Sequence, residues 1–156
     1  MNERCRIVNV YLDEKTVPRR SREVDRDRAV AIYDLLQENT FAPVDGLQGP
    51  FNLHLSVEEN RLRFDIRDDS DWPLTEFTLP LTSLRSIIKD YFTMCDSYYE
   101  AIKTASPSKI EALDMGRRAL HNEGSEILRD RIKSEVEVDF DTARRLFTLV
   151  CVLHWR

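Results

Sequence analysis

The sequence predicts an α+β fold in which helices cover one face of a small antiparallel sheet. Two patterns lead to this prediction. Apolar and polar residues alternate between Phe51 and Ile66, as they do in strands with one buried face. From Thr82 onward, apolar residues instead recur every three or four positions, which is the period of helices. Strands followed by a run of helices are typical of the α+β class, and we expect residues 1–156 to form one domain.

Four strands are expected. Ile7–Leu12 is rich in β-branched and large apolar residues, which predicts an N-terminal strand buried on both sides or nearly so. Residues 51–57 and 62–66 form an antiparallel hairpin, and Leu74–Leu81 adds a third strand to this meander. The acidic turn before the third strand lacks the glycine and the terminal glutamate of a calcium-binding loop, so we interpret it as a solvated turn.

One helix is expected near the N-terminus and three at the C-terminus, all packed on one face of the sheet. Ser21 can cap a first helix that runs to about Asn39. A second helix begins at Thr82. Ser106 followed by a proline marks the start of a third helix, which extends to Lys133.

The last helix, Ala143 to Trp155, is apolar on nearly every side. Such a helix lies either at the centre of the molecule or in a contact between two chains, so a homodimer through this C-terminal helix is one interpretation. A short extended segment is expected just before it, at residues 136–140. Residues 41–50 hold two glycines and two prolines and are predicted to be a loop.

The overall charge argues against nucleic acid and anionic membranes as partners. The chain has 23 basic and 28 acidic residues, a formal net charge of −5 and a pI near 5.3. A basic patch at Arg19, Arg20 and Arg22 is an alternative, but the interleaved acids favour a solvated helix surface with internal ion pairs. The longest apolar stretch, Leu146–Trp155, is about half the length that spans a bilayer.

Cysteine use and missing motifs predict a cytoplasmic protein without a cofactor. Cys5, Cys95 and Cys151 are far apart and odd in number, which favours buried, reduced thiols. The N-terminus lacks the apolar run of a signal peptide. The glycines form no nucleotide-binding motif, and the common zinc, metalloprotease and serine-hydrolase signatures are absent. No metal, cofactor or catalytic residue is therefore predicted.

The helix from Ser106 to Lys133 carries the densest group of polar residues in the chain. On its packed face, Gly116 and Gly124 fall among leucines at helical spacing. A glycine inside a helix costs about 1 kcal/mol relative to alanine. Two glycines on the packed face therefore predict that another helix or a ligand comes close to the backbone there.

A polar stripe beside that face is the candidate ligand site, and it consists of Asp114, Arg117, Arg118, His121 and Ser125. Residues three or four positions apart lie together on a helix. Two adjacent guanidinium groups repel a cation but match the shape of a carboxylate or phosphate. The stripe therefore favours an anion over a metal ion.

Two other interpretations of the stripe stay open. The arginines can pair with Asp114 and with acids on neighbouring helices, in which case the stripe is a structural polar network. In a catalytic interpretation, His121 is a general base, Asp114 or Glu123 orients it, and Arg118 stabilises an oxyanion. Glu123 points to the opposite side of an ideal helix, which weakens the catalytic interpretation.

Six segments of the chain have distinctive sequences: FDIRD (64–68), KDYF (89–92), SYYEAI (97–102), DMGRR (114–118), LHNEGSE (120–126) and VDFDTARRLF (138–147). They resemble uncharacterised protein family 0262, a set of small bacterial proteins, and the likeness covers nearly the whole chain. The resemblance implies a bacterial cytoplasmic protein. It brings no activity, cofactor or catalytic residue.

These observations favour a non-enzymatic cytosolic domain that binds another protein or has a regulatory role. The missing catalytic motifs and the apolar last helix motivate this hypothesis. The alternative is a small-molecule anion-binding protein or enzyme whose site contains Arg117, Arg118, His121 and Ser125. A concave pocket around Arg118 and His121 would support the alternative.

Overall fold

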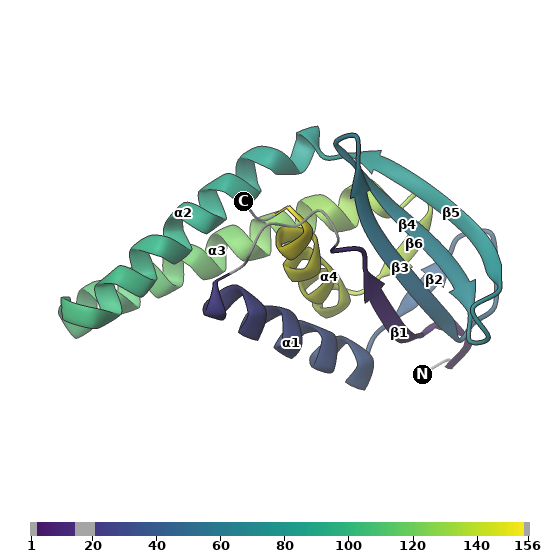
Figure 1. The fold of residues 1–156 in the computed structure, drawn as a ribbon, viewed down its shortest axis with the longest axis horizontal. Coiled ribbons are helices and arrows are strands. Elements are labelled where there is room, and N and C mark those ends of the chain that lie inside the picture. Colours follow the sequence, from purple (N-terminus) through teal and green to yellow (C-terminus); the bar gives the residue numbers. More distant parts are fainter. Residues whose placement is uncertain (1–2, 15–20, 155–156) are drawn as a thin grey trace.

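The structure is a computed structural model that describes residues 3–14 and 21–154, and its fold is α+β as predicted. Figure 1 shows a twisted sheet at one end of the molecule and helices on one side of it. The strands are β1 (Ile7–Leu12), β2 (Phe41–Pro43), β3 (Phe51–Glu58), β4 (Arg61–Asp68), β5 (Pro73–Pro80) and β6 (Val136–Val138). The helices are α1 (Arg22–Gln37), α2 (Thr82–Thr104), α3 (Pro107–Ile132) and α4 (Phe140–Leu153), after a short 3-10 helix, η1 (Glu3–Cys5).

The main sheet has the strand order β1-β3-β4-β5. The predicted meander is confirmed, because β3, β4 and β5 pair antiparallel in sequence order. β1 instead runs parallel to β3, with Val10 opposite Leu53, so the sheet is mixed and the prediction of a wholly antiparallel sheet was wrong. The chain between β1 and β3 includes α1, and a crossover of that length can return the chain to the same end of the sheet.

β1 is an edge strand, and the prediction that it is buried on both sides was wrong. Ile7 is its only fully buried residue. Tyr11 faces outward, 46% exposed, and its ring stacks on the ring of His54 with 4.6 Å between centroids. The strand is apolar in composition, but half of its side chains point to the face of the sheet that carries no helix in the described residues.

A second, two-stranded sheet joins distant parts of the chain. β2 pairs antiparallel with β6, and Phe41 lies opposite Val138. The extended segment predicted before the last helix is therefore confirmed, whereas the predicted loop at residues 41–50 begins with a strand. A three-residue strand has too few positions to show an alternating pattern, so only its partner reveals it.

The starts of α1 and α3 follow the predicted caps. Ser21 accepts a hydrogen bond from the backbone at the start of α1, and Ser106 does the same for α3 with Pro107 at the first helical position. Asp139 caps α4. Arg19 and Arg20 lie outside the described residues, as does Trp155 at the end of the chain.

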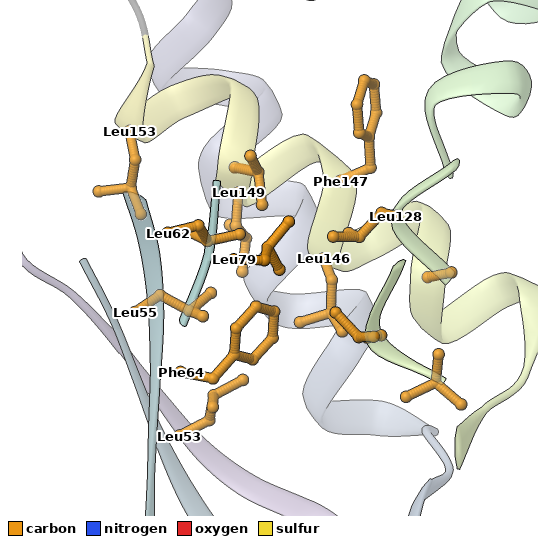
Figure 2. Close-up of a cluster of buried hydrophobic side chains, with 14 of the residues drawn as sticks. Leu53, Leu55, Leu62, Phe64, Leu79, Leu128, Leu146, Phe147, Leu149 and Leu153 are labelled. Atoms are coloured by element: carbon orange, nitrogen blue, oxygen red, sulfur yellow. The ribbon is translucent and has the colours of Figure 1, made fainter. Parts of the chain in front are cut away.

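α4 lies at the centre of the hydrophobic core. Figure 2 shows Leu146 and Leu149 pointing toward the sheet, where they meet Leu62 and Phe64, while Phe147 points away from the sheet. All of these side chains are buried within one chain. The apolar surface of α4 is therefore covered by the chain's own elements, which removes the motive for a homodimer through this helix. The oligomeric state itself stays a prediction.

The two glycines of α3 sit at close contacts, as predicted. A Cβ atom added at Gly124 would lie 2.2 Å from Cζ of Phe147 in α4. A Cβ atom added at Gly116 would lie 3.2 Å from Cε of Met94 in α2. In both places a side chain of a neighbouring helix approaches the glycine. α2 and α3 pack side by side and extend well beyond the sheet (Figure 1).

Candidate anion-binding site

A pocket of about 330 Å³ lies where α1, α3 and α4 meet, beside Tyr91 of α2. Its wall contains five arginines, which are Arg26 of α1, Arg117 and Arg118 of α3, and Arg144 and Arg145 of α4. Asp27 and Asp34 of α1 are the two acidic residues of the wall. We call this hollow the arginine pocket. It concentrates positive charge in a chain whose net charge is −5.

Only some residues of the predicted stripe line the pocket. Arg117, Arg118 and His121 line the arginine pocket. Asp114 lies beside it and pairs with both arginines, 2.8 Å from Arg117 Nε and 2.9 Å from Arg118 Nη2. Ser125 is fully buried, and its hydroxyl donates to the carbonyl oxygen of His121 at 2.7 Å. Ser125 is therefore not part of the pocket, because this part of α3 is packed inside the hydrophobic core.

The α3 arginines are oriented by neighbours but keep donors for a ligand. The guanidinium of Arg117 lies 4.2 Å from the centroid of the Tyr98 ring, and its Nε is bound to Asp114. The side chain of Arg118 is 70% exposed, so its ion pair with Asp114 is a weak surface contact. A guanidinium has five N–H donors, and these contacts leave several of them unused.

The remaining arginines have looser partners. Arg145 Nε lies 3.7 Å from a carboxylate oxygen of Asp34, and Arg144 Nη1 lies 4.0 Å from Asp141. The side chain of Arg26 forms no hydrogen bond or ion pair within the described part of the chain. Three helices thus present guanidinium groups to one hollow, and no carboxylate of the pocket binds them tightly.

His121 forms part of the pocket wall, but a ligand can reach neither ring nitrogen for proton transfer, because Nε2 is hydrogen-bonded and Nδ1 is buried. Its Nε2 lies 2.8 Å from the hydroxyl of Thr148, which donates to the carbonyl oxygen of Arg144 at 3.3 Å. The hydroxyl oxygen therefore accepts from Nε2–H. Nδ1 is buried and has no hydrogen-bond partner among the residues that the structure describes, and the ring meets Tyr91 and Phe147 edge to face. This arrangement favours a structural role over the general-base role considered from the sequence.

His121 is neutral at pH 7. Burial lowers its pKa to about 4, and the nearby Arg144, Arg145 and Arg117 guanidinium groups act in the same direction. The folded chain therefore binds the His121 proton less readily than the unfolded chain, in which the pKa of histidine is about 6.5.

Because the pKa of His121 is lower in the folded chain than in the unfolded chain, we expect the free energy of unfolding to fall by about 2 kcal/mol when the pH is lowered from 7 to 5. Stability from neutral His121 is fully present above about pH 6.5 and is lost as the pH falls toward 4, because the unfolded chain gains the proton first. Urea unfolding at both pH values measures the loss. His121→Gln should remove this part of the pH dependence, whereas His54→Gln, on the other face of the sheet, should keep it. Equal pH dependence in wild type and His121→Gln would contradict the prediction.

Sequence reasoning missed the residues that α1 and α4 contribute. Arg26, Arg144, Arg145 and Thr148 lie far along the chain from the predicted stripe. One signal could have found two of them, because the adjacent arginines 144 and 145 interrupt an otherwise apolar helix and repeat the arginine pair of α3. That these two pairs meet depends on how α3 packs on α4.

The described residues contain neither a candidate metal site nor a candidate membrane span. In ranges 3–14 and 21–154, no group of three or more His, Cys, Asp or Glu side chains could hold a metal ion. A search of the same residues finds no helix that combines the length and apolarity needed to cross a membrane.

The fold and the pocket define a small α+β protein with an arginine-lined hollow between its helices. A family model described as Uncharacterised protein family (UPF0262) matches residues 4–156, and the chain belongs to that family. The resemblance noted from the six sequence stretches is confirmed. The function of the family is unknown.

Relatives in several bacteria match over almost their whole length. The UPF0262 protein of Paramagnetospirillum magneticum is 54% identical, with 100% of this chain and 99% of the relative aligned. That of Bradyrhizobium sp. strain BTAi1 is 56% identical over 97% of this chain and 90% of the relative. The UPF0262 protein of Nitrobacter winogradskyi is 54% identical over 99% of this chain and 93% of the relative. No solved structure matches the chain.

Proposed function

We propose that this protein binds a small anionic molecule in the arginine pocket. The observation that carries the proposal is that five arginines from three helices line one hollow whose wall contains only two acidic residues. Guanidinium groups form paired, charge-assisted hydrogen bonds with carboxylates and phosphates. A volume of about 330 Å³ lies in the range of small-molecule sites.

The arrangement supports binding better than catalysis. His121 is held neutral by its surroundings, and its two nitrogens face Thr148 and the buried interior. A candidate general base needs to reach the proton that it abstracts. Arg117, Arg118, Arg144 and Arg145 then act as ligand-binding residues, and Asp114 holds the two α3 arginines in position.

A calorimetric titration with inorganic phosphate and with succinate tests the proposal. Replacing Arg118 and Arg145 together by glutamine should weaken phosphate affinity at least about tenfold, which corresponds to about 1.4 kcal/mol. The matched control replaces Arg61 and Arg63, which lie on the outer face of β4, and makes the same change in net charge. We expect it to change affinity less than about twofold. Equal weakening in both variants, or no binding of either anion, would overturn the proposal.

A cytoplasmic location and a partner protein stay as predictions from the sequence. Cys95 and Cys151 are buried and form no disulfide within the described residues, which supports a reducing compartment. Light scattering at tens of micromolar tests the homodimer. With the apolar residues of α4 buried inside one chain, we expect a monomer.

A further inference from the structure

The charges around the arginine pocket are not uniform. The pocket shares Asp27 and Tyr91 with a neighbouring hollow of about 390 Å³, which lies between the first half of α1 and the second half of α2. All five arginines line the arginine pocket, and none lines the neighbouring hollow. The neighbouring hollow holds more acidic than basic side chains, and aromatic rings of Tyr91, Phe92 and Tyr99 also line it. A molecule seated across Asp27 would meet positive charge at one end and negative charge at the other.

Asp27 itself lacks a strong partner. Its side chain is partly buried and forms no hydrogen bond or ion pair within the described part of the chain. Burial raises its pKa, although Arg117 and Arg26 act in the opposite direction. A partly buried carboxylate without a protein donor has lost part of its hydration, and a ligand donor would compensate for that loss.

The pocket arginines do not supply this donor. Arg117 is turned toward Asp114, with 2.8 Å between Nε and Oδ1, and its guanidinium lies over the Tyr98 ring. The carboxylate of the other pocket aspartate, Asp34, lies 3.7 Å from Arg145 Nε, which distinguishes it from Asp27. One cavity therefore combines a surplus of anion-binding groups with one unpartnered acceptor.

We propose, on the basis of the anion-binding function above, that the ligand is a zwitterion whose anionic group binds the arginines and whose ammonium group binds Asp27. The two groups of the ligand are close together, because Asp27 lines the same hollow as the arginines. The carbon part of the ligand lies toward Tyr91, whose ring borders both hollows.

A matched pair of probes tests this inference. O-Phosphoethanolamine and ethyl phosphate carry the same phosphate ester and differ in the ammonium group. Calorimetry on the wild-type chain should show O-phosphoethanolamine binding at least about tenfold more tightly than ethyl phosphate. In Asp27→Asn the preference should disappear, while ethyl phosphate binds as tightly as in wild type or more tightly. Retained binding of ethyl phosphate also shows that the variant is folded.

The control is Asp90→Asn, an exposed residue of α2 outside both hollows, and it should keep the wild-type preference. If neither probe binds the wild-type chain, the anion-binding proposal fails as a whole. If both probes bind equally, or if Asp27→Asn keeps the tenfold preference, anion binding stands and the zwitterion inference is overturned.

Discussion

Replacing Asn39 with alanine is expected to lower the free energy of unfolding by about 3–5 kcal/mol. Asn39 is 1% exposed and joins the end of α1 to β1. Its Oδ1 accepts from the N–H of Ile7 at 2.8 Å, and its Nδ2 donates to the carbonyl oxygens of Ile7 at 2.9 Å and Leu35 at 2.8 Å. Alanine leaves these backbone groups buried without partners, and each such group costs about 1–3 kcal/mol.

Urea unfolding monitored by circular dichroism measures this loss. Asn122→Ala is the matched control, because Asn122 is exposed in the middle of α3 and its replacement should change stability by less than about 0.7 kcal/mol. Asn39→Asp keeps the acceptor and loses the two donated bonds, so it should also be strongly destabilising. A loss below about 1 kcal/mol in Asn39→Ala would show that water replaces the side chain.

Replacing Gly124 with alanine is expected to lower the free energy of unfolding by about 3 kcal/mol, although alanine is the better helix former. The new Cβ atom would lie 2.2 Å from Cζ of Phe147. Phe147 is fully buried, so its ring cannot move aside without disturbing the rest of the core. The overlap therefore outweighs the gain of about 1 kcal/mol in helix propensity.

Gly116→Ala in the same helix is the matched control. There the new Cβ atom would lie 3.2 Å from the terminal carbon of Met94, a flexible side chain that can shift. We expect stability to change little or to rise by up to about 1 kcal/mol. Combining Gly124→Ala with Phe147→Leu should cost less than the sum of the two single replacements. Additive losses would show that the overlap with Phe147 is not the cause.

Local patterns predicted most of the elements correctly, for reasons that particular residues make clear. The alternation from Phe51 to Ile66 depends only on which face of each strand is buried, so it predicted the β3–β4 hairpin correctly. Ser21, Ser106 and Asp139 mark helix starts because their side chains accept from backbone N–H groups a few residues later. Both features act within a few residues, so the sequence displays them directly.

The direction of β1 and the pairing of β2 with β6 did not follow from local patterns. The composition of Ile7–Leu12 is the same for a central strand and for an edge strand, and for a parallel and an antiparallel neighbour. Asn39 likewise gave no signal, because its three hydrogen bonds depend on the position of β1 beside the end of α1.

The sequence by itself determined the α+β class, the helix and strand limits within a few residues, the close contacts at the α3 glycines and the arginine stripe of one helix. The tertiary structure alone decided that α4 is buried within one chain, that Ser125 lies in the core, and that the arginines of α1 and α4 face those of α3. The physical reason is that helical periodicity places residues around one axis. The angle and distance between two helices depend on how their side chains pack. The arginine pocket lies between three helices, so the periodicity of a single helix could not reveal it.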